Sequence, residues 1–392
     1  MKIFSEDISD IEKELADLVK EVHHSHNLAE RRCVLATLEA LAYFYNIMGY
    51  DGMKYLKEVY NNKSFIRPIT EKNGTIKNRI NNDFIKNKDY YLDLLDNIFN
   101  DDVEVDLGYN PNLPEPNIDE SEMYEILSDY FKSTEKQEAL DNFKYMSNNG
   151  RIQSIYLSDD STKGVTFLNL MTNDSRIFIS KALDSNPIRT MIALAHEMGH
   201  VADYAKIKDL KSRVYYNFKS PFVEVLSSLY EKEFIDFLIK NNIYKYQTLN
   251  CLGEFYDQLF SLAAQSSIYH AIPNKVLKHN RYMKLTKKEL IEEISKEYEV
   301  LVDSDEFPEP QDLDFSEYLE YGYGRILGTY FSRLKIEDKE KYQEEMSKFL
   351  SLRTDYFDKN YLEKIGTNTN KVVELVDRDI NLSSAKVKVK RI

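Results

Sequence analysis

The stretch Met191–Tyr204 has the sequence MIALAHEMGHVADY and contains the pattern H-E-x-x-H. We place the chemistry of the protein in this stretch, and the rest of the chain is its structural setting. Residues four apart lie on one face of a helix, so His196 and His200 can bind a single metal ion together. Glu197 lies between them in the sequence and can reach the open side of that metal. These residue types at this spacing are typical of a zinc hydrolase.

The residues around the motif predict that it lies in the middle of a buried helix. Asn186 is a typical N-cap residue and Pro187 is favoured in a first helical turn, which predicts a helix over residues 187–205. Apolar or small residues recur at steps of three and four and form one stripe for packing in the interior: Ile188, Met191, Ile192, Ala195, Gly199 and Ala202. The alternative is a surface helix on which two histidines have this spacing by coincidence.

The composition describes a globular chain and limits the ligands that a metal could have. Charged residues make up 30% of the 392 residues and apolar residues 42%, which allows a large core and two or three domains. Only Cys33 and Cys251 are present, far apart, which excludes a disulfide framework and a cysteine-rich zinc site. A metal therefore has to be held by histidines and carboxylates.

Charge and hydropathy argue against nucleic acid and membranes as partners. The formal net charge of −14 disfavours nonspecific binding to polyanions. The sequence has no run of eighteen apolar residues, and its acidic start lacks the basic and apolar blocks of a secretory signal. We therefore expect a cytoplasmic protein that binds neither nucleic acid nor membrane, while its oligomeric state stays open.

The pattern along the chain predicts mainly helices and one hinge. Amphipathic helices are expected within residues 5–60, and three prolines within residues 109–121 indicate a boundary. We place a helical N-terminal domain at residues 1–115 and the catalytic domain at residues 116–392. The histidines within residues 23–26 could bind a metal weakly, but they lack a catalytic carboxylate at a useful spacing, and a solvated helix end is the better explanation.

Short β-rich runs precede the motif helix and predict a small sheet beside it. They are RIQSIYLS from Arg151, GVTFLNLM from Gly164 and RIFIS from Arg176. Further helices are predicted at residues 122–146, 222–240, 254–269, 287–301, 315–334 and 339–352. The predicted fold is thus mainly α, a helical body with a small β-sheet next to the H-E-x-x-H helix.

A catalytic zinc site takes a third protein ligand and leaves its fourth position to water. Glu224 is the preferred candidate, because it lies 28 residues after His196 between apolar neighbours that indicate burial. A buried carboxylate is unfavourable unless it is paired or bound to metal. Glu231 and Asp203 are the alternatives, and Asp203 could instead accept a hydrogen bond from a ligand imidazole or lie exposed.

These residues resemble the zinc peptidases of the thimet oligopeptidase and oligoendopeptidase F group. The signature H-E-x-G-H is matched by His196–His200, and the glutamate motif E-x-x-S that follows it is matched by Glu224–Ser227. The resemblance implies one zinc ion (Zn²⁺) per chain, held by the two histidines and Glu224. We expect Asp203 and Ser227 to lie beside these ligands and support them. Glu197 would then act as the general base.

The resemblance also implies where a substrate binds. Gly164, Val165 and Thr166 match the family's substrate-binding edge strand, and Tyr323 takes the place of the tyrosine that hydrogen-bonds the oxyanion, with Tyr321 beside it. Two departures are visible in this sequence. The family's histidine about a dozen residues before that tyrosine is missing, with Gln311 and Asp312 in its region, and the histidine usual three residues after the second ligand is Asp203.

We therefore expect a zinc-dependent endopeptidase or oligopeptidase that hydrolyses peptides or unfolded proteins with a metal-activated water and Glu197 as base. One alternative is a regulatory or toxin-like metalloprotease with a single protein substrate. Another is a catalytically impaired homologue that only binds peptides. The cleavage specificity, the size limit and the natural substrate do not follow from the sequence.

Overall fold

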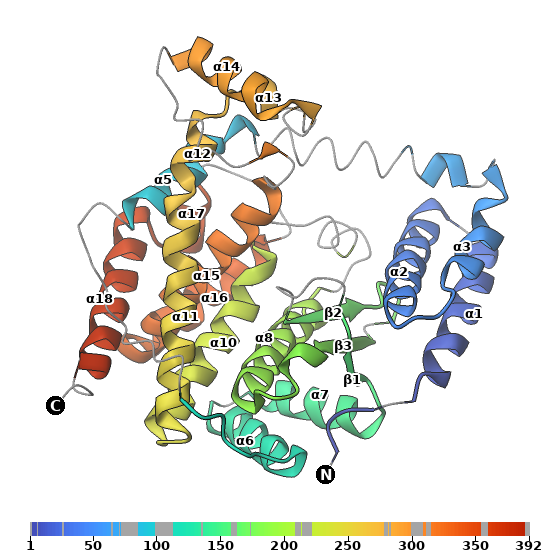
Figure 1. Ribbon diagram of the computed structural model, residues 1–392, viewed down its shortest axis with the longest axis horizontal. Coiled ribbons are helices and arrows are strands. Elements are labelled where there is room, and N and C mark those ends of the chain that lie inside the picture. The colour runs from blue at the N-terminus through green and yellow to red at the C-terminus, as the bar shows by residue number, and fades with distance from the viewer. Residues whose placement is uncertain are drawn as a thin grey trace. The chain divides into compact units, whose positions relative to one another are not determined.

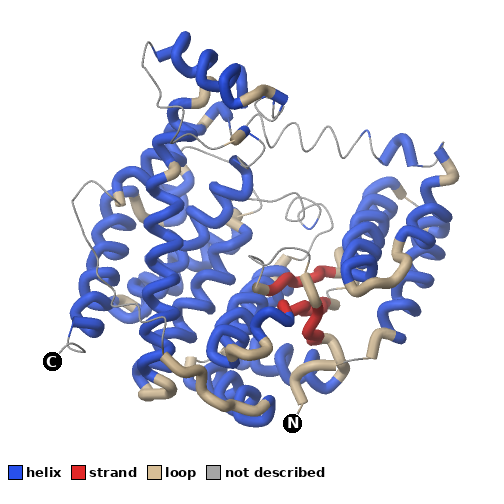
Figure 2. The backbone as a smooth tube through the Cα atoms, viewed as in Figure 1, coloured by secondary structure: helices blue, strands red, loops and turns tan. Residues whose placement is uncertain are grey.

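The computed structural model is mainly helical and contains one small three-stranded sheet, which confirms the predicted fold class (Figures 1 and 2). The residues that it describes are 2–5, 7–25, 27–63, 66–69, 71, 85–98, 113–134, 136–157, 163–172, 174–207, 213, 222–277, 281, 284–298, 309–310, 315–353 and 360–388. Within these ranges, no helix combines the length and the apolar character that a bilayer span requires.

The chain forms two compact units. The first consists of Met1–Asn73, Asn110–Phe218 and Leu226–Cys251, and the second of Gly74–Tyr109, Lys219–Val225 and Leu252–Ile392. The division passes through one continuous helix, α10 (Val223–Lys240), whose first turn is counted with the second unit. The predicted division into domains at residues 1–115 and 116–392 stays a prediction.

The sheet of the first unit has the strand order β1-β3-β2. Strand β3 (Ser175–Ser180) lies in the centre, parallel to β1 (Ile152–Ile155) and antiparallel to β2 (Gly164–Leu168). Strands β1 and β2 lie within predicted β-rich runs, and β3 begins one residue before the third run. β2 is therefore an edge strand, and the pairing of Gly164 with Ile179 fixes its register against the buried centre.

The two faces of the sheet have different neighbours. One face shares an apolar core with the helices α1 (Ser9–His24), α2 (Leu28–Ile47) and α3 (Met53–Tyr60), and Phe167 and Phe178 belong to this core. Figure 1 shows helix α8 (Pro187–Ala205) beside β2 and β3. Because side chains alternate along a strand, β2 directs Val165 and Phe167 to the first face and its other residues to α8.

Helix α8 begins and ends at the predicted residues. The side chain of Asn186 accepts a hydrogen bond from the backbone N–H of Arg189 at 3.1 Å, and Pro187 occupies the first turn. Both features are favourable because the first N–H groups of a helix have no partner within the helix. Most of its residues are buried, as the apolar stripe predicts. The remaining helices of this unit are α6 (Glu120–Ser133), α7 (Gln137–Asn148), most of α10, the 3₁₀ turn Lys181–Leu183 and the start of α11 (Lys245–Ala264).

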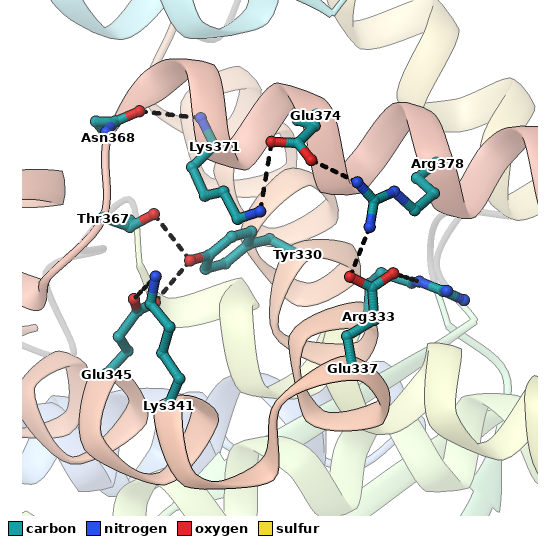
Figure 3. Close-up of polar contacts among 10 residues, drawn as sticks. All are labelled: Tyr330, Arg333, Glu337, Lys341, Glu345, Thr367, Asn368, Lys371, Glu374 and Arg378. Carbon is teal, nitrogen blue, oxygen red and sulfur yellow. Dashed lines mark hydrogen bonds and ion pairs between the residues drawn. The ribbon is translucent and has the colours of Figure 1, made fainter.

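Within its described residues, the second unit contains helices and their connections but no strand. It contains most of α11 together with α5 (Lys88–Asn97), α12 (Ser266–Ala271), α13 (Asn274–Leu277), α14 (Lys287–Tyr298), α15 (Phe315–Glu337), α16 (Lys339–Leu352), α17 (Tyr361–Ile365) and α18 (Thr369–Lys388). A buried polar network joins three of its segments (Figure 3), where the hydroxyl of Tyr330 contacts Glu345 at 2.6 Å and Thr367 at 2.8 Å. Burial raises the pKa of the Glu345 carboxyl, and the hydrogen bond from the Tyr330 hydroxyl offsets part of this rise.

Candidate metal centre

Helices α8 and α10 bring together the three predicted metal ligands. His196, His200 and Glu224 each offer one ligand atom, and these atoms all lie within 4.8 Å of one another. The histidines are half-buried and Glu224 is buried. Two imidazoles and one carboxylate are a donor set that suits zinc and leaves a position for water. The residues present therefore fit the metal that the motif predicts, whose identity the side chains alone do not fix.

A glycine within the motif allows the two helices to approach closely. A Cβ atom at Gly199 would lie 2.5 Å from the Cα of Ser227 and 2.6 Å from the carbonyl oxygen of Leu226. No real side chain fits at such distances, so the backbone of α10 passes directly over Gly199. Ser227 is fully buried in this contact and lies three residues after Glu224 on the same helix face. The glycine thus determines how near Glu224 can come to the histidines.

A second glutamate of α10 orients one of the ligand rings. Nδ1 of His196 lies 2.9 Å from a carboxylate oxygen of Glu231, which is buried and seven residues after Glu224. An ionised carboxylate can only accept, so Nδ1 carries the proton and Nε2 keeps its lone pair for a metal. From the sequence, Glu231 is expected only as an alternative ligand, although its spacing of two turns from Glu224 places both on one face.

Asp203, the residue preferred for this orienting role, is fully buried near the end of α8. Burial is the largest cause that raises the pKa of Tyr230, and the negative charge of Asp203 raises that pKa further. The acceptor of the hydrogen bond from His196 is instead Glu231. A role for Asp203 and Ser227 in supporting the ligands stays a prediction.

Glu197 is buried and its carboxylate faces the edge strand β2. The hydroxyl of Thr166 lies 2.7 Å from Oε2 of Glu197 and 3.1 Å from its backbone oxygen. On the same face of the strand, a Cβ atom at Gly164 would lie 2.9 Å from Oε1 of Glu197. The predicted base and two of the three predicted substrate-binding residues are therefore neighbours.

Tyr323 lies in the interior of the second unit. Its hydroxyl donates to the carbonyl oxygen of Tyr91 at 3.3 Å, and its ring packs edge-on against Tyr91 and Phe222. Burial is the main cause that raises its pKa far above the usual value for tyrosine. Tyr321, by contrast, is 38% exposed. The assignment of either tyrosine to the oxyanion stays a prediction, and Gln311 and Asp312 lie outside the described residues.

The neighbour of Tyr323 in the sequence does reach the candidate centre. A Cβ atom at Gly324 would lie 2.4 Å from the Cβ of Glu224 and 2.7 Å from its carbonyl oxygen. Helix α15 therefore passes directly against the first turn of α10. Because Gly324 has no side chain, Glu224 can lie in direct contact with α15.

A second group of potential ligands occurs in the second unit. Asp93, Asp96 and His270 also offer atoms within 4.8 Å of one another, but Asp93 is exposed and the other two are half-buried. Nε2 of His270 lies 2.8 Å from Asp96. An ordinary ion pair at the surface is sufficient to explain this group.

No family model matches this chain, and no curated protein matches it in sequence. A crystal structure described as a "putative peptidase from Chlamydophila abortus" is similar with a TM-score of 0.48 and 14% identity, over 97% of this chain and 63% of that one. A second, described as a "putative oligoendopeptidase F from Bacillus anthracis", has a TM-score of 0.42 and 13% identity over 99% and 76% of the two chains.

The chain thus spans 63% of the length of the first of these proteins. At such low identity the site has to be judged from its own residues. Those residues define a mainly helical protein with a candidate metal centre of two histidines and one glutamate.

Proposed function

We propose that this protein is a zinc-dependent peptidase that hydrolyses peptide bonds with Glu197 as the general base. The observation that carries the proposal is the convergence of His196, His200 and Glu224 within 4.8 Å, with Glu197 buried on the same helix as the two histidines. A purely structural metal site has no need of an additional carboxylate beside its ligands.

The ligands have separate tasks in this proposal. His196 and His200 would hold the ion through ring nitrogens, and Glu224 through a carboxylate oxygen. When bound, zinc supplies Lewis acidity that makes water a nucleophile near neutral pH and polarises a carbonyl group. Glu231 keeps the His196 ring in one tautomer and one orientation through the 2.9 Å hydrogen bond.

Glu197 would take a proton from the attacking water and pass it to the leaving amine. Its position one residue after His196 turns its side chain away from the ligands, so it can act on the water without binding the metal. An extended peptide would add as a further strand along the edge of β2, with Gly164, Val165 and Thr166 beside it. The substrates would be peptides or unfolded proteins.

Glu197→Gln provides the test of this assignment. The amide is nearly isosteric with the carboxyl group but cannot accept the proton, so peptide cleavage should fall by at least about a hundredfold. Zinc content and thermal stability should stay at the wild-type values. A chelator should abolish the wild-type activity and added zinc should restore it. Cleavage by the variant at the wild-type rate, or activity that resists chelation, would reject the hydrolytic role.

Tyr323 is our candidate for the oxyanion donor, on condition that its long bond to the Tyr91 carbonyl opens when substrate binds. Its neighbour Gly324 already contacts Glu224. A donor aimed at the developing charge contributes about 3–4 kcal/mol, so Tyr323→Phe should lower kcat by about a hundred- to a thousandfold with little change in KM. Tyr321→Phe, on the exposed side of the same helix, should have a smaller effect. A normal kcat for Tyr323→Phe would assign this tyrosine to packing alone.

A further inference from the structure

The two oxygens of the Glu197 carboxylate have different neighbours on strand β2. The hydroxyl of Thr166 lies 2.7 Å from Oε2, an ordinary distance for a hydrogen bond between two oxygen atoms. It also lies 3.1 Å from the backbone oxygen of Glu197, so one hydroxyl contacts both the side chain and the main chain of the same residue. A carboxylate can only accept, and Thr166 is therefore the donor.

Gly164 lies two residues earlier on the same face of the strand, beside the other oxygen. A Cβ atom there would lie 2.9 Å from Oε1 of Glu197, 3.1 Å from its Cγ and 3.0 Å from Cδ1 of Ile179. Its φ angle lies outside the left-handed region, so the glycine is not needed for the backbone conformation. What it provides is space next to Oε1.

The strand is held firmly enough to impose this arrangement. Gly164 and Thr166 pair with Ile179 and Ile177 of the buried strand β3. Phe167 is fixed on the opposite face in the apolar core of α1–α3. A slip of one residue would turn Phe167 out of that core, so the position of the Thr166 hydroxyl relative to α8 is well defined.

We propose that Thr166 is a positioning residue for the general base, holding Oε2 of Glu197 so that Oε1 is the oxygen that takes the proton from water. This inference rests on the proposed function. An unrestrained glutamate side chain has three rotatable bonds, and a base acts efficiently only when its accepting atom is held within hydrogen-bond reach of the proton. In the transfer, an O–H bond of water breaks and an O–H bond forms at Oε1.

Thr166→Val tests the proposal, because it removes the hydroxyl and keeps the shape of the side chain. We expect kcat for peptide cleavage to fall by about ten- to a hundredfold, the scale on which a misplaced catalytic group acts. KM and zinc content should not change. Thr166→Ser keeps the donor and should recover most of kcat.

Thr37→Val is the matched control. Thr37 of α2 is also a buried threonine whose hydroxyl is hydrogen-bonded, to the carbonyl oxygen of Cys33 at 2.8 Å and to the N–H of Leu170 at 3.1 Å. The control should lower the midpoint of urea unfolding while kcat per zinc-loaded molecule stays at the wild-type value. A wild-type kcat for Thr166→Val would overturn the proposal. A raised KM with unchanged kcat would also overturn it, and would assign Thr166 to peptide binding instead.

A measurement without activity tests the contact itself. In the metal-free protein, Thr166→Val should lower the urea midpoint by more when Glu197 is present than in a Glu197→Ala background, because only the first protein loses the bond to Oε2. Equal decreases in the two backgrounds would contradict the proposal. If Glu197→Gln kept full activity, the proposed function would fail, whereas a wild-type kcat for Thr166→Val beside an inactive Glu197→Gln would reject the positioning role alone.

Discussion

His196, His200 and Glu224 come from two buried helices, whereas Asp93, Asp96 and His270 belong to helices whose side chains partly face solvent. Both groups bring three ligand atoms within 4.8 Å of one another. They differ in what surrounds them. Close approach of ligand atoms is thus a weak criterion for a metal centre, and the residues around the ligands distinguish the two groups.

The first group has support at two of its ligands, His196 and Glu224. Glu231 holds His196, Gly199 admits α10 close to α8, and Gly324 admits α15 close to Glu224. In the second group, Asp96 already pairs with His270, and an ion pair that remains in contact with water contributes little. A buried carboxylate without a cation is unfavourable, whereas an exposed one is well solvated.

Among variants that test the difference between the two groups, we expect the largest effect on zinc affinity from Glu231→Gln. The amide oxygen can still accept a hydrogen bond from Nδ1, but it carries no negative charge. Loss of such an orienting partner typically lowers metal affinity by about ten- to a hundredfold. Competition with a chromophoric chelator would measure the affinity. Glu233→Gln is the matched control, because Glu233 lies on the same helix and pairs with Lys136 at 2.9 Å. An equal loss of affinity in both variants would show that Glu231 acts only through the stability of α10.

Gly199→Ala should have an intermediate effect. The added methyl group would lie 2.5 Å from the Cα of Ser227, so α10 has to move and to carry Glu224 away from the histidines. Overpacking of this kind typically costs about 1–3 kcal/mol in the free energy of unfolding. We expect a lower urea midpoint together with weaker zinc binding. Unchanged zinc affinity would mean that Glu224 does not depend on the approach of the two helices.

The smallest effect is expected in the second group. His270→Ala removes the only imidazole of this group and one partner of a half-buried ion pair that still contacts water, which contributes less than about 1 kcal/mol to stability. Zinc content and peptide cleavage should stay at the wild-type values. Loss of one zinc ion per chain in this variant would show that exposure alone does not disqualify a group of ligands.

The helices and strands that the sequence predicts well are those with local signals. Asn186-Pro187 marks the start of α8, and each strand coincides with a β-rich run to within one residue at its start. The prediction for residues 254–269 begins late and misses the break at Gln265, where α11 gives way to α12. The polar segment KYQTLN at the start of α11 has weak apolar periodicity, so the apolar pattern predicts a helix only from a later residue.

In the candidate site too, the sequence predicts the residues with local signals but not the contacts between distant residues. His196 and His200 follow from spacing on one helix, and Glu224 from a carboxylate among apolar residues. The contact between Thr166 and Glu197 depends on the register of a sheet, and the bond from Tyr323 to Tyr91 joins residues 232 positions apart. No local pattern encodes such pairs.

The most direct test of the account is the zinc content of two double variants of the purified protein, measured by elemental analysis. His196→Ala/His200→Ala should lose the single zinc ion of the wild type and all peptide cleavage. Asp96→Asn/His270→Ala should keep both. Zinc retained at one per chain in the first variant, or lost in the second, would contradict the assignment of the metal centre to α8 and α10.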